Sequence, residues 1–366
     1  MKIALVHDWL TGMRGGEKVL EQLCGIFPQA DIYTLICDRN KISDKIKKHR
    51  IKTSFLQLFP GIMKSYRNFL PLFPAAIESF NLKKYDLVVS SSHCVAKGVK
   101  TGKKTIHVCY CHTPMRYAWD QFDNYFSPEK NGKLKFFIIS RLMEGLRKWD
   151  VETVSRVDFY IANSEHVKKR IQKHYNREAV VINPPVDTDF YFFDDTPVKE
   201  DVFLMVSALT EYKKVDFVID VFNGLNDKNL AIIGAGPMLA KLKKSVKRDN
   251  IKMLGSVDDE TVREYYRKSK AFIFPGEEDF GITMGEAQAC GLPVLAYNKG
   301  GALEIIIDGE TGEFFNGTKE DFIKKLEKIE NTLYDSKKVA ENGKRFAEPV
   351  FREKITAFLK ERELYE

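Results

Sequence analysis

Short apolar runs alternate with helical segments along the first half of the chain. Runs of this kind are typical of buried strands, and helices between them favour parallel pairing. The first five lie at residues 2–6, 32–36, 86–90, 105–110 and 158–162. This alternation predicts a doubly wound parallel sheet.

A second series of strands and helices follows residues 183–187, N-P-P-V-D, whose prolines end regular structure. A chain of 366 residues exceeds what a single core usually fills. We therefore predict an α/β protein with two Rossmann-like domains, a cleft between them, and a ligand at the carboxyl ends of the strands. The strands of the second series are predicted at 202–207, 230–233, 251–254, 271–274 and 294–297.

The segment 278–286, E-D-F-G-I-T-M-G-E, places Glu278 and Glu286 on either side of a strand-to-helix turn, ahead of a helix predicted over 284–290. Backbone N–H groups at a helix start suit a phosphate, and the carboxylates can accept hydrogen bonds from sugar or ribose hydroxyls. The segment therefore fits a nucleotide sugar. An acidic turn on an ordinary helix explains the spacing equally well.

Two predicted strands of the first half are also followed by residues suited to ligand binding or catalysis. A glycine-rich turn, residues 12–17, follows the first strand and lets the backbone approach a diphosphate or an acceptor at the helix start. Its spacing is not that of the dinucleotide fingerprint. His112 follows the strand at 105–110 and begins the run H-T-P-M-R-Y-A-W-D, residues 112–120. A histidine at this place points to a ligand site, and a packed or capping histidine is the alternative.

These motifs together resemble the retaining glycosyltransferases of family 4, which have the GT-B fold. The E-x7-E spacing of 278–286, a G-G-x-E loop and the proline linker occur in the family's order. The run 112–120 is similar to the signature of a subgroup that includes O-antigen mannosyltransferases. The resemblance implies an acceptor domain over 1–182, completed by a C-terminal helix at 346–366, and a nucleotide-sugar donor domain over 183–345.

The resemblance also implies roles for single residues. His112 and Glu278 would contact the donor sugar and Lys213 the diphosphate, and these three form the expected catalytic set. The match is incomplete, because Ala208 stands where many relatives carry an arginine. For Arg116 and Asp120 an ion pair between the two is an equal alternative to an acceptor role. The expected acceptor residues are Glu17, Arg116 and Asp120, and the expected donor-binding residues are Gly15, Gly16, Lys213, Lys214, Ser256, Val257, Phe280, Gly281, Ile282, Thr283 and Glu286, the last on the ribose.

The implied activity is retaining transfer of a hexose, with mannose from GDP-mannose favoured, onto a lipid-linked glycan in bacterial surface polysaccharide synthesis. Alternatives are a UDP-hexose donor, an epimerase of the same fold, and a nucleotide-sugar-binding subunit without turnover. No cofactor or metal is expected. The only D-x-D considered, at Asp187 and Asp189, lies beside the proline linker and is interpreted as a structural turn.

The net charge of +7 is moderate, but basic residues are concentrated in one early stretch and interleave there with bulky apolar residues. Such a surface, within residues 41–73, suits anionic lipid headgroups, and a solvated basic face with core aromatics is the alternative. No recognisable motif supports nucleic acid as the partner. The basic residues are Lys41, Lys45, Lys47, Lys48, Arg50, Lys52, Lys64 and Arg67.

The chain start, residues 1–6, is interpreted as a strand rather than a signal peptide, and no apolar run has the length of a membrane span. We expect a cytoplasmic protein, peripheral on the inner face of the membrane. Its six cysteines lack the spacing of a zinc site or a disulfide framework, so we expect reduced core thiols.

Overall fold

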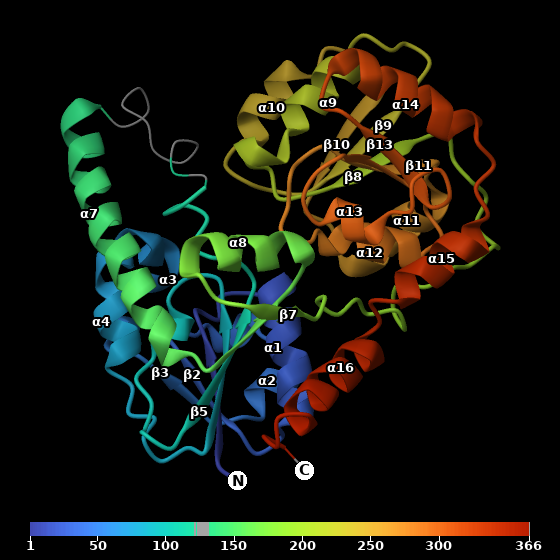
Figure 1. The fold of residues 1–366 in the computed structure, drawn as a ribbon. Coiled ribbons are helices and arrows are strands. Elements are labelled where there is room, and N and C mark those ends of the chain that lie inside the picture. Colours follow the sequence, from blue (N-terminus) through green and yellow to red (C-terminus); the bar gives the residue numbers. More distant parts are fainter. Residues whose placement is uncertain (121, 123–131, 366) are drawn as a thin grey trace. The chain divides into compact units, whose positions relative to one another are not determined.

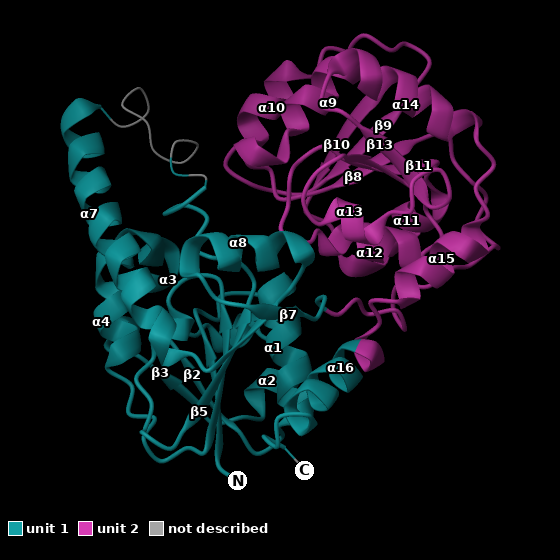
Figure 2. Ribbon diagram, in the orientation of Figure 1, with its two compact units in different colours: residues 1–184, 351–366 teal, residues 185–350 magenta. Residues whose placement is uncertain are grey.

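The computed structural model describes residues 1–120, 122 and 132–365 (Figure 1). It divides into two compact units, drawn in different colours in Figure 2. Unit 1 comprises residues 1–184 and 351–366, and unit 2 comprises residues 185–350. The sequence-based boundaries were placed after residue 182 and before residue 346. Each unit is described separately below.

Unit 1 is built on a seven-stranded parallel sheet in the order β3-β2-β1-β4-β5-β6-β7. Because the order reverses between β1 and β4, the loops after these two strands diverge and leave room for a ligand. The strands are β1 (Ile3–His7), β2 (Asp31–Thr34), β3 (Ile51–Thr53), β4 (Leu87–Ser92), β5 (Ile106–Cys111), β6 (Phe159–Ala162) and β7 (Ala179–Val181).

Alternate residues of β1 enter two separate cores, as the strand pleat requires. Leu5 packs with the helix α1 and with Phe351 and Phe358 of the last helix, α16. Val6 packs on the other face, where Leu146 of α7 also lies. The longer helices of the unit are α1 (Gly15–Ile26), α7 (Lys133–Glu152), α8 (Glu165–Tyr175) and α16 (Glu348–Lys360), and the shorter ones are α2 (Asp44–Lys47), α3 (Ile62–Ser65) and α4 (Phe73–Glu78).

Unit 2 repeats this plan with a six-stranded parallel sheet in the order β10-β9-β8-β11-β12-β13. The order reverses between β8 and β11. The predicted class, two Rossmann-like α/β units, is confirmed. The strands are β8 (Phe203–Val206), β9 (Leu230–Ile233), β10 (Ile251–Gly255), β11 (Ala271–Phe274), β12 (Val294–Tyr297) and β13 (Gly312–Phe315), and the helices are α9 (Val215–Phe222), α10 (Leu239–Ser245), α11 (Asp259–Lys268), α12 (Ile282–Ala289), α13 (Ala302–Ile305), α14 (Lys319–Asn331) and α15 (Ser336–Lys344).

The three strands that the sequence did not predict, β3, β7 and β13, all lie at sheet edges. Each has only three or four residues. The sequences of β3, I-K-T, and β13, G-E-F-F, also lack the continuous apolar run of a strand buried on both faces, whereas β7, A-V-V, is apolar but short. The ten predicted strands all form. Apolar periodicity therefore located all the interior strands and the edge strand β10, but not the other three edges.

All six cysteines are buried and none forms a disulfide. Within the described part of the chain, no helix combines the length and the apolar character needed to cross a bilayer. The helix α7 nevertheless exposes a row of large apolar side chains, Leu134, Phe137, Ile138 and Leu142, at helical spacing.

Candidate active site

Asp8 organises the loops at the carboxyl end of the unit 1 sheet. It directly follows β1 and is fully buried. Its two carboxylate oxygens accept four backbone N–H bonds of 2.6–3.0 Å from residues 93–96, the loop after β4. His93 Nδ1 lies 3.1 Å from Asp8 Oδ2 as well. One carboxylate thus fixes the β4 loop to the end of β1, where the strand order reverses.

Three histidines meet beside this carboxylate. The hydroxyl of Ser91 lies 2.8 Å from His112 Nε2 and 3.1 Å from His7 Nδ1, so one serine links the two rings. The His93 ring is 6.1 Å from that of His7 and 6.2 Å from that of His112. Burial, reinforced by His93, lowers the pKa of both His7 and His112 to about 3. Both rings are therefore neutral at physiological pH.

The glycine loop at the start of α1 faces these rings. A Cβ on Gly16 would lie 3.4 Å from the His7 ring and 3.7 Å from His112 Nε2, so the backbone here approaches the histidines closely. Glu17 lies one residue further on, is buried, and accepts the backbone N–H of Arg14 at 3.1 Å. Burial raises the pKa of Glu17. The structure thus gathers His112, Gly16 and Glu17, which are distant in sequence, at one edge of the sheet.

The run 112–120 is anchored by Arg170 of α8. The guanidinium donates to the Thr113 hydroxyl and to the Pro114 carbonyl, the latter at 3.2 Å, and forms an ion pair of 2.6 Å with Asp120. Asp120 also contacts Lys173 and His174 of the same helix. Asp120 therefore fastens the run to α8, whereas Arg116 is half-buried elsewhere in it.

Sequence reasoning did not single out Arg170, Ser91 or His93. The polar run S-S-S-H that ends the strand around β4 was an available signal for the last two. Arg170 gave none, because it lies in an ordinary amphipathic helix and its role depends on tertiary contact.

In unit 2, Lys213 and Glu278 form an ion pair at the corresponding reversal of strand order. Lys213 follows β8 and Glu278 follows β11, and these neighbouring strands lie at the centre of the sheet. Nζ of Lys213 is 2.5 Å from Oε1 of Glu278, and the side chains are 16% and 11% exposed. Two residues that are 65 positions apart in the sequence are thus in direct contact. The ammonium also lies 5.6 Å from the Phe274 ring.

The turn into α12 requires a glycine. Gly281 has φ +91°, and a Cβ there would lie 2.4 Å from the end of Met284 and 3.1 Å from the Phe274 ring. The helix starts at Ile282, so the amides of Ile282 and Thr283 are in its first turn, where helical bonds leave N–H groups unused. The predicted helix start, residue 284, was two residues late.

Glu286 lies in the second turn of α12 and is half-buried. It accepts a hydrogen bond of 3.2 Å from the hydroxyl of Tyr266, a fully buried residue of α11. This bond orients the carboxylate. Phe280, at the base of the turn, is buried against Phe346 with ring centroids 5.2 Å apart.

Neighbouring loops support this turn through close backbone packing. A Cβ on Gly301 would lie 2.3 Å from Phe280, and the N–H of Gly301 donates to the Glu278 carbonyl at 2.9 Å. The remaining expected donor residues lie on other strand-end loops: Lys214 is exposed with φ +55° before α9, and Ser256 and Val257 follow β10.

The D-x-D has a turn structure. The carboxylate of Asp187 accepts the N–H of Phe190 at 3.0 Å, and its carbonyl accepts the N–H of Tyr191 at 2.8 Å. Among the residues that the structure describes, no three His, Cys, Asp or Glu side chains are grouped so as to hold a metal ion.

Two family models match the chain. The model for "Glycosyltransferase Family 4" matches residues 13–190 and the model for "Glycosyl transferases group 1" matches residues 187–346. Two Rossmann-like units with strand-end sites define a protein of GT-B type. Since the two models together span residues 13–346, the chain belongs to the family 4 glycosyltransferases.

Similar proteins carry related names. An uncharacterized glycosyltransferase of Methanocaldococcus jannaschii is 29% identical over 54% of this chain and 56% of its own length. An alpha-1,3/1,6-mannosyltransferase of Dictyostelium discoideum is 25% identical over 72% of this chain and 71% of its own. A GDP-mannose-dependent alpha-(1-6)-phosphatidylinositol monomannoside mannosyltransferase of Mycolicibacterium smegmatis is 27% identical over 49% of this chain and 54% of its own. Two of these alignments span only about half of the relative's length.

Among solved structures, HepE of Anabaena in complex with UDP and glucose has a TM-score of 0.70. The match covers 99% of this chain and 100% of that one at 16% identity, and so concerns the fold.

Proposed function

We propose that this protein is a retaining glycosyltransferase that moves a hexose from a nucleotide sugar to a lipid-linked glycan. The observation that carries the proposal is the Lys213–Glu278 pair beside the α12 turn. A cation, a carboxylate and unused helix amides converge there at the reversal of strand order, where Rossmann-like sheets bind nucleotides.

In the proposed donor site, the ammonium of Lys213 turns from Glu278 to the diphosphate when the donor binds. This exchange frees the Glu278 carboxylate to accept hydrogen bonds from the sugar hydroxyls, while Glu286 accepts those of the ribose. Thr283 and its neighbours supply backbone N–H groups. Lys213 thus has an anionic partner in both states, and Glu278 exchanges the ammonium for hydrogen-bond donors, which limits the cost of their partial burial.

The proposed reaction needs no covalent nucleophile. The bond between the anomeric carbon and the diphosphate breaks, and the oxocarbenium-like sugar is stabilised by preorganised dipoles and charges. The acceptor hydroxyl attacks from the face that the diphosphate leaves, and its proton passes to the departing phosphate oxygen, so configuration is retained. We propose that His112 contacts the donor sugar. As a neutral ring with a pKa of about 3, it would act as a hydrogen-bond partner and not as a cation.

The test is a screen of nucleotide sugars for binding and hydrolysis by the full chain, followed by Glu278→Ala. The variant is expected to keep its affinity for free nucleoside diphosphate and to lose turnover. Glu277→Ala, which removes an adjacent exposed carboxylate, is the matched control and should retain both. Equal loss of affinity and turnover in Glu278→Ala would contradict the assigned role.

For the donor we propose GDP-mannose, which two relatives support by name: one is a mannosyltransferase and the other is GDP-mannose-dependent. A UDP-hexose is the second candidate, because the structural neighbour HepE holds UDP and glucose. A binding subunit without turnover stays a third candidate, since the exposed Ala208 supplies no second cation. The screen separates the three: the nucleotide sugar that is hydrolysed distinguishes the first two, and binding without hydrolysis identifies the third.

We also propose that no metal is required and that residues 41–73 contact anionic membrane. Exposed Phe55, Leu58, Phe59 and Leu72 support the membrane contact, which would bring the enzyme to a lipid-linked acceptor as in surface polysaccharide synthesis. Lys52 is unsuited to a test, because its ammonium is 2.7 Å from Asp31 and 2.9 Å from the Tyr33 hydroxyl. Replacing the exposed Lys45, Lys48 and Arg50 with Gln should reduce co-sedimentation with phosphatidylglycerol vesicles.

A further inference from the structure

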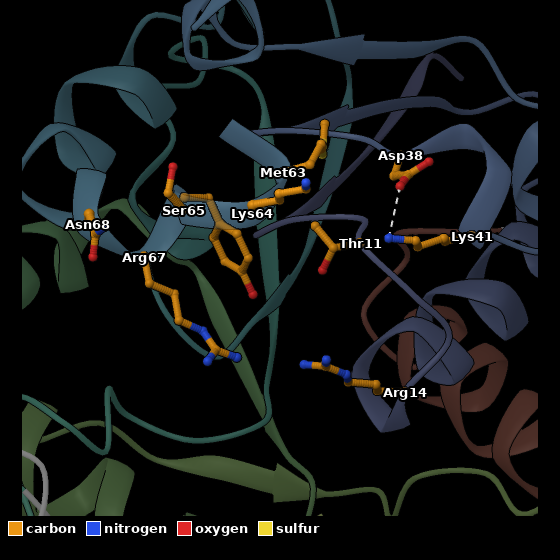
Figure 3. Close-up of a pocket in the computed structure, with 10 residues that line it drawn as sticks. Thr11, Arg14, Asp38, Lys41, Met63, Lys64, Ser65, Arg67 and Asn68 are labelled. Atoms are coloured by element: carbon orange, nitrogen blue, oxygen red, sulfur yellow. Dashed lines mark ion pairs between the residues drawn. The ribbon is translucent and has the colours of Figure 1, made fainter. Parts of the chain in front are cut away.

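A cavity of about 440 Å³ opens in unit 1 among the loops that follow β1, β2 and β3. Cationic side chains come to it from three segments: Arg14 from the glycine loop, Lys41 from the loop after β2, and Lys64 and Arg67 from α3 and the turn that follows it. Figure 3 shows the side chains of Arg14 and Arg67 pointing toward each other across the cavity. Ligand cavities of this size are usually mostly apolar, so four cations mark this one for a charged ligand.

The positive charge of the cavity is largely uncompensated. Lys41 forms an ion pair of 3.2 Å with Asp38, the acidic residue of the lining. Arg14, Lys64 and Arg67 form no ion pair with any residue that the structure describes. Thr11 adds a hydroxyl to the lining. Guanidinium groups that converge from separate elements are suited to hold the oxygens of a phosphate or diphosphate.

A chain of aromatic contacts links the cavity to the histidine cluster. Tyr66 lines the cavity and packs on Trp9, with ring centroids 5.2 Å apart. Trp9 in turn meets His93 at 4.4 Å, and His93 neighbours His112. The cavity and the cluster therefore belong to the same carboxyl edge of the unit 1 sheet. The rings of Tyr66, Trp9 and His93 thus connect the cavity to His112, which we assign to the donor sugar.

The cavity also borders an exposed apolar surface. Phe59 is 40% exposed and contacts Phe69, with ring centroids 5.2 Å apart, directly after the lining residues 63–68. Leu58 and Leu72, which flank this contact in sequence, are 83% and 40% exposed. Cations beside exposed apolar side chains match a ligand that joins a phosphate to a hydrocarbon chain, in contrast to nucleic acid or a phosphopeptide.

We infer that this cavity binds the phosphate of a lipid-linked acceptor, an inference that rests on the proposed transferase function. The cavity shares Lys41, Lys64 and Arg67 with the basic stretch considered for membrane contact, but the exposed Lys45, Lys48 and Arg50 of that stretch lie outside its lining. Its cations surround one anionic group, whereas a membrane surface would present many. In this arrangement Arg14, which lies in the glycine loop, positions the acceptor near the histidine cluster.

The test measures anion binding with the donor site already occupied. The full chain is saturated with the nucleoside diphosphate that it binds best, and is then titrated calorimetrically with inorganic pyrophosphate and with decyl diphosphate. We expect both to bind, decyl diphosphate more tightly. The double variant Lys64→Gln with Arg67→Gln should weaken both by at least about tenfold, because two charge-assisted contacts are lost. Both residues are exposed, so the fold is not at risk.

The matched control is Lys45→Gln with Lys48→Gln, which removes the same charge from exposed positions outside the cavity lining. It should bind both diphosphates as the unmodified chain does. Equal binding by the cavity variant and the control would overturn the inference, as would an absence of pyrophosphate binding to the unmodified chain. The inference would also be overturned if the cavity variant lost binding to phosphatidylglycerol vesicles but kept its affinity for both diphosphates. That result would assign the cavity to bulk lipid headgroups.

The two proposals fail in different ways. If the unmodified chain binds and hydrolyses no nucleotide sugar, the proposed transferase function is wrong. If it hydrolyses a donor but the cavity variant keeps its diphosphate affinity, only the acceptor site is wrong.

Discussion

Mild acidification should destabilise unit 1 selectively. All seven histidines of the chain lie in residues 1–184, and none lies in unit 2. Burial lowers the pKa of His7 and His112 to about 3 and that of His107 to about 4. His107 is held in a neutral form, because its Nδ1 donates to the Arg156 carbonyl at 2.9 Å and its Nε2 faces the Ser90 hydroxyl at 2.8 Å.

The sign and size of this loss of stability follow from proton linkage. A histidine whose pKa is lowered on folding takes up its proton first in the unfolded chain, so its contribution to stability is present above about pH 6.5 and is lost as the pH falls. As the pH falls from about 7 to about 5.5, each of these three histidines lowers the free energy of unfolding of unit 1 by about 1.3 kcal/mol, and the three together lower it by about 4 kcal/mol. Glu17, whose pKa is raised by burial, opposes part of this loss. A change of this size is a large share of the stability of a typical domain.

The chain offers a selective probe of this effect. Its three tryptophans, Trp9, Trp119 and Trp149, all lie in unit 1, so tryptophan fluorescence, excited selectively over that of tyrosine, follows that unit alone during urea unfolding. Far-ultraviolet circular dichroism follows both units. The fluorescence midpoint should fall markedly between about pH 7 and about pH 5.5. In His107→Asn, which can keep the bond to the Arg156 carbonyl, the loss should shrink by about one third.

An unchanged fluorescence midpoint across this pH range would refute the reasoning, because it would mean that the buried rings titrate normally in the folded state. If His107→Asn lost as much stability between these pH values as the unmodified chain does, the share of the effect assigned to His107 would be wrong.

Three further outcomes can be checked directly. Glu286→Gln should weaken nucleoside diphosphate binding by about tenfold to a hundredfold through loss of charge-assisted ribose bonds, whereas Tyr266→Phe, which removes only the orienting hydroxyl, should have a smaller effect in the same calorimetric titration. Lys97→Met should destabilise unit 1 by about 3–5 kcal/mol in urea unfolding, because it removes the ammonium that lies 2.9 Å from buried Asp150 and leaves that carboxylate without a cation. The control Lys100→Met removes an exposed ammonium from Glu78, which keeps its ion pair with Arg156, and should cost less than about 1 kcal/mol. Turnover should survive EDTA, and its loss with recovery on adding magnesium would contradict metal independence.

The interiors of both sheets could be predicted from sequence because each central strand is a continuous apolar run. The run at 271–274 became β11 without change of bounds, and 230–233 became β9. The edge strand β13 could not be found in this way, because its four residues, G-E-F-F, include a glycine and a charged residue and give no continuous apolar run. The start of α12 was misplaced because Gly281, in the left-handed region, begins the helix earlier than the apolar pattern indicates.

The sequence by itself determined the class of the protein, because strand-helix alternation and ordered local motifs are properties of consecutive residues. It also identified the individual chemical groups of the candidate site, which are the carboxylates at 278 and 286, Lys213 and His112. Only the tertiary structure decided which of them meet. The Lys213–Glu278 pair, the Ser91 link between two histidines, the Arg170 anchor and the cationic cavity each join segments that are remote in the chain. Such contacts arise because parallel sheets bring the carboxyl ends of successive strands to one edge, whatever their separation in sequence.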